Sequence, residues 1–373
     1  MTRRQLLAAT ASASAAFTFD RVFAQTPPAQ LRNMGGAPAG FGAHSSGGRG
    51  GLGAPARGAA PGGGRGAAGG GRGPAFDFLG YFHGLGFGVA EGARPASNDP
   101  DAIKAFRARV EEYHMRVILD VGYPRDENGL EAFEASVKMA KEAGAISLHA
   151  AMTQRRYEEF NDFAAFKASF ERNQKSIAMA EPVLRKYQMR LGLENHKGWR
   201  SAEQAAWLKR LGSEWVGVHF DFGNNVSLCE DPADTLKNLL PYTFACHIKD
   251  MAVEPYEDGF LLSEVPLGDG ILDLARWVAA LSQRDPRIPF DLETITRDPL
   301  KIPVFTKKYW ATFDDSYSPL PGRDLARVLE IVHRNPPKKP LPRTYGLSEE
   351  QQTRLEAENN LMSIRYARQT LHL

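Results

Sequence analysis

Four apolar runs in the second half of the chain contain side chains that can bind a metal ion near their carboxyl ends. These side chains are Glu194, Asp221, His247 and Glu293. Three carboxylates brought close together repel one another, and a divalent cation would remove that conflict. An oxygen-rich set with one imidazole suits Mn²⁺ or Mg²⁺ best, with Zn²⁺ or Co²⁺ as alternatives. The residue types therefore predict a site for one divalent metal ion.

Each run is predicted to be a β-strand, in which side chains alternate between two faces. In the run 216–221 this alternation puts His219 on the same face as Asp221. It likewise puts Lys249 with His247 in the run 244–250. Successive candidate ligands lie 27, 26 and 46 residues apart. The first two spacings are close to the roughly 31 residues per strand–helix unit of an average (β/α)₈ barrel, and the third leaves room for a long loop at 251–270.

Strand-like and helical patterns alternate over about 300 residues, which is typical of the α/β class. The predicted strands span residues 116–121, 146–152, 190–195, 216–221, 244–250 and 288–294, with one more inside 78–89. The predicted helices span residues 99–114, 129–143, 161–187, 202–211, 232–240, 271–283 and 325–333, and a final helix opens at Ser348 with a capping box to Gln351. A (β/α)₈ TIM barrel is the expected fold, with its metal ligands at the carboxyl ends of the strands. Seven strands are evident, and the eighth is expected between residues 76 and 98.

The amino-terminal quarter of the chain has a different composition. Residues 1–24 have the features of an export signal, with the pair Arg3 and Arg4 ahead of a small-residue apolar run. Residues 25–75 are rich in Gly, Ala, Pro and Arg, and residues 34–74 contain no acidic residue. Such a segment buries little apolar surface, so we expect a disordered linker. The barrel is then expected over residues 76–335, followed by a Pro-rich crossing and a helix over 336–373.

Charge and cysteine content exclude several classes of protein. The first 76 residues carry eight basic side chains and one acid, which leaves 38 basic and 43 acidic side chains in the rest. This mildly acidic body gives no electrostatic reason to expect a nucleic-acid partner. No second hydrophobic segment is long enough to span a membrane. Cys229 and Cys246 do not form a disulfide framework, and we expect two free thiols.

Five short motifs occur in a fixed order: LENH at 193–196, DFGNN at 221–225, HIKD at 247–250, VPLGDG at 265–270 and LET at 292–294. Together they resemble the xylose isomerase-like superfamily of sugar isomerases and epimerases, over roughly residues 115–300. The resemblance implies that Glu194, Asp221, His247 and Glu293 bind one metal ion. It also implies that Glu194 and Glu293 act as acid and base on opposite faces of a sugar, transferring a proton next to its carbonyl.

Further side chains on the same inner face are candidates for binding a carbohydrate substrate. They are His149, His196, His219, Lys249 and, from an aromatic segment at 304–317, Trp310. Ordinary polar packing and core packing are competing interpretations for these residues. The twin-arginine pattern predicts export to the periplasm, where an unphosphorylated sugar is the expected substrate. A homo-oligomer is compatible with the sequence.

Three alternatives remain open from the sequence. A lyase or dehydratase acting on a keto-sugar would use the same enolisation. A carbohydrate-binding protein would use the same scaffold without catalysis. The apurinic-endonuclease branch of this superfamily needs a multi-zinc site and a basic face, which the acidic body disfavours. Ketose epimerases of the superfamily usually carry an Arg shortly after the metal-binding His, and residues 251–260 contain none.

Overall fold

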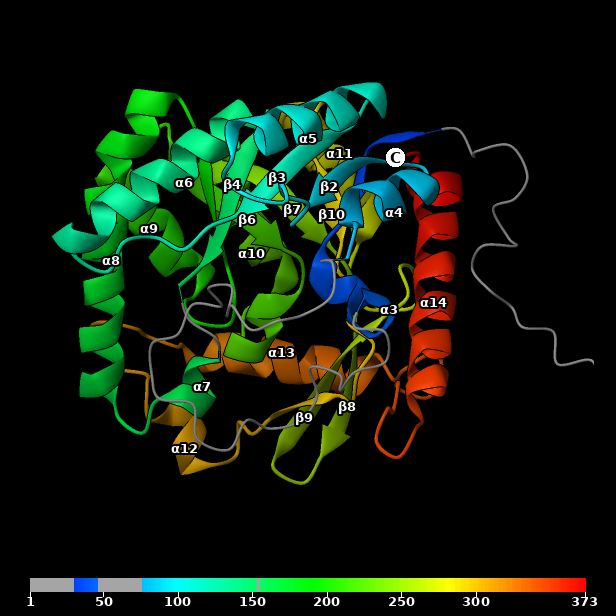
Figure 1. The fold of residues 1–373 in the computed structure, drawn as a ribbon. Coiled ribbons are helices and arrows are strands. Elements are labelled where there is room, and N and C mark those ends of the chain that lie inside the picture. The colour runs from blue at the N-terminus through cyan, green and yellow to red at the C-terminus, as the bar shows by residue number, and fades with distance from the viewer. Residues whose placement is uncertain (1–29, 46–75, 153–154) are drawn as a thin grey trace, which may run out of the picture.

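A computed structural model describes residues 30–45, 76–152 and 155–373. Its centre is a closed barrel of eight parallel strands, as predicted (Figure 1). In spatial order the strands are β1 (Leu31–Gly36), β10 (Phe290–Leu292), β7 (Thr243–Ile248), β6 (Val216–Asp221), β5 (Leu191–Glu194), β4 (Ser147–Ala151), β3 (Arg116–Asp120) and β2 (Phe87–Glu91). Every neighbouring pair is parallel, including β1 with β10, which closes the barrel.

The first barrel strand lies where the sequence predicted a linker. β1 pairs with β2 and β10, so the eighth strand is not within residues 76–98. That segment instead holds the helix α4 (Phe78–Gly84) and β2. The linker prediction is therefore wrong for residues 30–45, whereas residues 1–29 and 46–75, with the predicted export signal, lie outside the described part of the chain.

Glycine is needed in β1 for close packing. A Cβ at Gly35 would overlap the carboxylate of Asp291 and lie 2.7 Å from Cβ of Val89. A Cβ at Gly36 would lie 2.5 Å from the ring of Phe82. Residues without a Cβ let a backbone approach its neighbours this closely. The Gly-rich composition that suggested flexibility here permits a tightly packed strand.

Helices surround the barrel and cover its strands (Figure 1). The helices are α3 (Gly42–Ser45), α4 (Phe78–Gly84), α5 (Pro100–Glu112), α6 (Leu130–Glu142), α7 (Arg156–Glu159), α8 (Phe163–Tyr187), α9 (Ser201–Leu211), α10 (Pro232–Leu239), α11 (Leu274–Arg284), α12 (Lys307–Trp310), α13 (Gly322–Arg334) and α14 (Glu349–Tyr366). The predicted start of α5 is confirmed, since Asp99 accepts a hydrogen bond from the backbone N–H of Asp101. α8 continues through Pro182 without a break.

The segment predicted as a long loop at 251–270 is an antiparallel hairpin. It consists of β8 (Asp250–Tyr256) and β9 (Gly259–Val265), and β11 (Leu300–Ile302) extends it to three strands. The loop prediction was therefore wrong. Because β8 follows β7 almost directly, this small sheet lies at the carboxyl end of the barrel strands, together with α7, α12 and α13 (Figure 1). These elements cover the end at which the candidate ligands lie.

The last helix, α14, holds the amino-terminal segment against the barrel. Its predicted capping box is present, with Ser348 and Gln351 each accepting a hydrogen bond from the other's backbone N–H. Glu356 of α14 accepts hydrogen bonds from the backbone N–H groups of Ala43 and His44, at 2.7 and 2.9 Å.

Among the described helices, none is both long and apolar enough to cross a membrane.

Candidate metal centre

The four predicted metal ligands converge at one end of the barrel. Glu194 ends β5, Asp221 ends β6, His247 lies in β7, and Glu293 follows β10 directly. Glu194, Asp221 and His247 each offer one ligand atom, and these atoms lie within 4.8 Å of one another. Glu293 adjoins them, with Oε2 at 3.4 Å from Nδ1 of His247. All four side chains are buried.

Lys249 is the positive partner of the carboxylates in the structure. Its ammonium group lies 2.8 Å from the carboxylate of Asp221 and 3.0 Å from Oε2 of Glu293. A third carboxylate, that of Glu264, lies 3.6 Å away. Burial opposes the charge of Lys249, but these acids outweigh it and raise its pKa well above the usual value. An internal lysine therefore neutralises the buried acids in the structure.

The orientation of His247 leaves one ring nitrogen available to a metal ion. Its Nε2 lies 2.9 Å from both carboxylate oxygens of Glu91 and donates a hydrogen bond there. Its Nδ1 makes no hydrogen bond within the described part of the chain and faces Glu293. A carboxylate behind the ring is the usual means of orienting a metal-binding histidine. Burial lowers the pKa of His247, but Glu293 and Glu91 outweigh it and raise the pKa to about 10, so a cation at Nδ1 would displace a proton. The donor set thus fits a divalent cation on two chemical grounds: carboxylate oxygens and an oriented imidazole ring.

The neighbouring histidines and Lys249 affect the pKa values of the three buried carboxylates differently. Burial raises the pKa of Glu293, but His247 and Lys249 outweigh it and hold the pKa at about 2. For Glu194, burial is outweighed by His196, His149 and His247, so its pKa is well below the usual value. Both groups are ionised at neutral pH. For Asp221, burial dominates and raises the pKa well above the usual value despite Lys249.

The other predicted histidines also lie at the barrel interior or beside it. Nδ1 of His149 lies 2.8 Å from Oδ1 of Asp120, and its Nε2 lies 3.4 Å from Glu194. The ring of His219 is completely buried, with its centroid 4.1 Å from that of His247. His196 follows β5, is half-buried, and interacts electrostatically with Glu194. The predicted inner-face set is thus brought together, although a role in substrate binding stays a prediction.

A comparison with protein-family models matches residues 79–311 to the family described as xylose isomerase-like TIM barrel. The chain belongs to this family. No curated protein matches the sequence significantly. Similar solved structures include a D-psicose 3-epimerase (14% identity, 79% of this chain and 92% of that chain, TM-score 0.49). Others are a D-psicose 3-epimerase from Clostridium cellulolyticum (14%, 69% and 91%, TM-score 0.47) and a xylose isomerase domain protein from Planctomyces limnophilus (13%, 66% and 85%, TM-score 0.45).

Two residues beside the candidate metal centre of this xylose isomerase-like barrel were not among the site residues predicted from the sequence. Nδ2 of Asn224 donates hydrogen bonds to Asp221 and, at 3.2 Å, to Oε1 of Glu194. Its Oδ1 accepts a hydrogen bond from the ammonium group of Lys197, which is buried. Burial and the neighbouring Lys249 lower the pKa of Lys197 to about 8. Both residues follow strand ends, where a strand period no longer indicates which side chains point inward.

Trp310 lies in a separate aromatic cluster. Its Nε1 donates a hydrogen bond to the backbone oxygen of Val304 at 2.8 Å, and its ring contacts those of Tyr309 and Phe313. The guanidinium group of Arg156 lies over the ring of Phe313 at 4.1 Å. In the described residues these contacts support packing for Trp310, and its predicted role in substrate binding stays a prediction.

The Gly268-Asp269-Gly270 turn surrounds an internal carboxylate. Asp250 accepts hydrogen bonds from the backbone N–H groups of Gly268 and Gly270, at 3.0 and 2.9 Å, and from those of Met251 and Leu272. Burial nevertheless raises the pKa of Asp250 to about 6. A Gly-rich turn can bind a phosphate group through its backbone N–H groups, but here these groups donate to Asp250, which supports a structural role for the turn.

Cys229 and Cys246 are buried free thiols, as expected.

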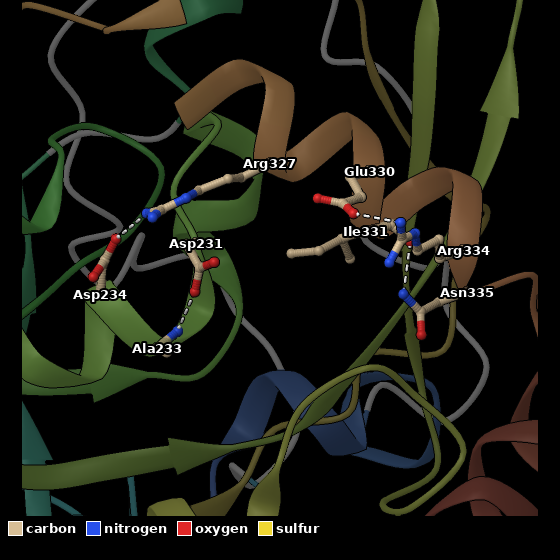
Figure 2. A pocket seen from close by; sticks show the side chains of 8 residues that line it. All are labelled: Asp231, Ala233, Asp234, Arg327, Glu330, Ile331, Arg334 and Asn335. Carbon is tan, nitrogen blue, oxygen red and sulfur yellow. Dashed lines mark hydrogen bonds and ion pairs between the residues drawn. The ribbon is translucent and has the colours of Figure 1, made fainter. Parts of the chain in front are cut away.

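A surface cavity lies between the start of α10 and α13 (Figure 2). It is lined by Asp231, Ala233, Asp234, Arg327, Glu330, Ile331, Arg334 and Asn335. Arg327 and Asp234 pair across it at 3.2 Å. None of the metal-centre residues lines this cavity. Its own charges are already paired at an exposed surface, so it offers no chemistry that competes with the barrel end.

Proposed function

We propose that the protein is a divalent-metal-dependent sugar isomerase or epimerase. The reaction would move a proton at the carbon beside the carbonyl of an unphosphorylated sugar or sugar derivative. One observation carries this proposal: Glu194, Asp221, His247 and Glu293 are all buried and converge at the carboxyl ends of four neighbouring strands. Burying three carboxylates together is costly unless cations compensate them. Such a cost is typical of a functional site.

The order of strands supports an acid and a base on two sides of a substrate. β5 and β10 are separated in the barrel by β6 and β7, so Glu194 and Glu293 flank Asp221 and His247. A divalent cation bound to this set would supply a Lewis acid that stabilises the negative charge of an enediolate. Glu194, ionised by its histidine neighbours, takes the proton from one face of the sugar. Glu293 exchanges a proton on the other face.

Deuterium incorporation tests this proposal. The purified protein, loaded with Mn²⁺, is incubated in D₂O with free sugars, glycosides and 3-keto-sugars, and the products are read by NMR. We expect deuterium next to the carbonyl, and its loss in Glu194→Gln and Glu293→Gln. The surface variant Glu142→Gln is the matched control, because that acid is exposed on α6 and pairs only weakly with Lys138. Binding of sugars without any deuterium incorporation would refute the proposal and favour a carbohydrate-binding protein.

A second reaction of the same site is favoured by Lys197. In an elimination from a keto-sugar, Glu194 takes the proton beside the carbonyl, and the bond from the next carbon to its oxygen substituent breaks. The departing oxygen needs a proton, and Lys197, buried near the carboxylates with a pKa of about 8, is suited to donate it. Elimination gives an unsaturated ketone that absorbs in the ultraviolet and a released alcohol or water, whereas epimerisation leaves the substrate's mass unchanged. Product analysis therefore separates the two reactions.

Export is part of the proposal and rests on the sequence pattern at Arg3 and Arg4. A twin-arginine route carries folded protein, which is compatible with metal loading before export. A periplasmic location agrees with an unphosphorylated substrate. Cell fractionation tests this: replacing both arginines with lysine should retain the protein in the cytoplasm. An unchanged distribution would contradict the assignment of the signal without affecting the proposed chemistry.

A further inference from the structure

A second group of ligand-type side chains lies inside the barrel next to the first. It consists of Glu91, His219 and Asp291, which come from β2, β6 and β10. One ligand atom from each lies within 4.8 Å of the others. His219 and Asp291 are two residues before Asp221 and Glu293 on the same strands, so they face the same interior one step towards the other end. None of the three belongs to the ligand set described above.

Polar atoms in this group lack hydrogen-bond partners. Neither ring nitrogen of His219 and neither carboxylate oxygen of Asp291 makes a hydrogen bond within the described residues. Both side chains are fully buried. Arg116, which interacts electrostatically with Asp291, directs its guanidinium group to the backbone oxygens of Arg32 and Arg287. Buried carboxylates and imidazoles are normally satisfied, so each exception calls for an explanation, and a bound ion is one that serves both side chains at once.

The interior is shaped to accommodate the group. The position opposite Asp291 on β1 is Gly35, where any side chain would overlap the carboxylate. The apolar filling that barrels normally carry is here reduced to a small cluster, Val89, Ile118 and Ala245. Polar side chains thus replace branched apolar ones at buried positions. Packing alone does not explain this exchange, because apolar residues would fill the space without unsatisfied polar atoms.

We propose that Glu91, His219 and Asp291 form a second site for a divalent cation. Two carboxylates and one neutral imidazole balance a charge of +2 and suit Mn²⁺, Fe²⁺, Co²⁺ or Zn²⁺. Oε2 of Glu91 lies 3.4 Å from Nε2 of His219, so this pair already faces a common point. The proposal does not depend on the reaction assigned to the first site.

Glu91 couples the two sites. It accepts the hydrogen bond from Nε2 of His247, whose other ring nitrogen faces the first site. A cation on Glu91 would draw electron density from that carboxylate and so weaken the hydrogen bond that orients His247. Occupancy of the second site should therefore lower the affinity of the first for its metal ion.

Metal content and anomalous diffraction test the proposal. The wild-type protein is equilibrated with excess Mn²⁺ or, separately, Zn²⁺, freed of unbound metal and assayed by plasma mass spectrometry. We expect two ions per chain, falling to one in Asp291→Asn and in His219→Gln, and to one in Glu194→Gln through loss of the other site. Glu142→Gln is the control, because this exposed acid on α6 belongs to none of the possible metal-binding groups, and it should retain two ions.

Anomalous diffraction from wild-type crystals soaked in Mn²⁺ keeps the test informative if the buried variants do not fold. A peak surrounded by Glu91, His219 and Asp291 supports the proposal. A single ion per chain at saturating metal, with its peak at Glu194, Asp221 and His247, overturns it. Loss of an ion in Asp120→Asn, with two ions retained in Asp291→Asn, would assign the ion to Glu91, Asp120 and His149 and overturn the proposed ligand set. Failure of the deuterium experiment leaves this result unaffected, so the two proposals fail separately.

Discussion

Replacing Lys249 with methionine tests whether this lysine substitutes for a metal ion in the metal-free protein. The ammonium group lies within 3.0 Å of Asp221 and Glu293 and within 3.6 Å of Glu264, and its side chain is 1% exposed. Methionine has a similar volume but no charge, so Lys249→Met leaves three buried carboxylates without this partner. Breaking a buried ion pair costs about 3–5 kcal/mol. For a domain of this size that cost corresponds to a fall in Tm of roughly 6–10 °C.

Thermal unfolding with EDTA and with saturating Mn²⁺ gives the assay. A cation that binds only the folded protein stabilises it. It should stabilise Lys249→Met more than the wild type, because it neutralises the repulsion among the carboxylates that Lys249 no longer compensates. The Tm deficit should therefore shrink when Mn²⁺ is present. Lys138→Met, at an exposed lysine paired at 3.9 Å, is the control and should change Tm little. An equal deficit with and without Mn²⁺ would refute the reasoning, because the carboxylates would then not respond to a cation.

Three further predictions concern positions around the barrel. Asn224→Ala removes the amide that contacts two of the carboxylates, so affinity for Mn²⁺ should fall about 10- to 100-fold in competition with a chelating dye; unchanged affinity would contradict this orienting role. Gly35→Ala forces a Cβ against Asp291 and should lower the free energy of unfolding, measured in urea, by about 1–3 kcal/mol. Gly84→Ala is the control and should not lower it, because a Cβ at Gly84 meets no atom within 4 Å. Equal effects would argue against β1 as a barrel strand. Burial lowers the pKa of Lys197 from 10.5 to about 8, so the unfolded chain binds more protons between these values and stability should rise with pH across that window, by about 3 kcal/mol. Lys197→Met should remove this rise relative to the wild type, and parallel stability curves would contradict the assignment.

The regular part of the barrel was predictable because its strands carry a strong period. In β5, β6, β7 and β10, outward-facing apolar residues alternate with polar or small residues that face inward, and the helices between them have a single apolar face. β1 was missed for a physical reason. Its glycines allow close contact with Asp291 and Phe82, and composition alone does not distinguish this from flexibility. The hairpin of β8 and β9 was missed because charged residues and Pro255 interrupt its apolar pattern.

The convergence of the four candidate ligands was predictable from the sequence, whereas the charge balance around them was not. Glu194, Asp221, His247 and Glu293 follow from strand period and spacing. Glu91 ends a Gly-rich run whose strand bounds the sequence did not define, so its hydrogen bond to His247 was not anticipated. Side chains that orient metal ligands are often distant in sequence, here by 156 residues, and no local pattern reports them.

The HIKD motif places a candidate metal ligand two residues before the lysine that neutralises the neighbouring carboxylates. Alternation puts His247 and Lys249 on the same face, so one strand delivers both an imidazole and an ammonium group to the same carboxylates. Asp221 and Glu293 bind this ammonium group in the structure and are also the residues that a divalent cation would need. A divalent cation at this site would therefore compete with Lys249, and its apparent affinity would be lower by the cost of displacing this partner. A barrel arranged in this way can fold without a cation at this site, because Lys249 already places a positive charge beside Asp221 and Glu293.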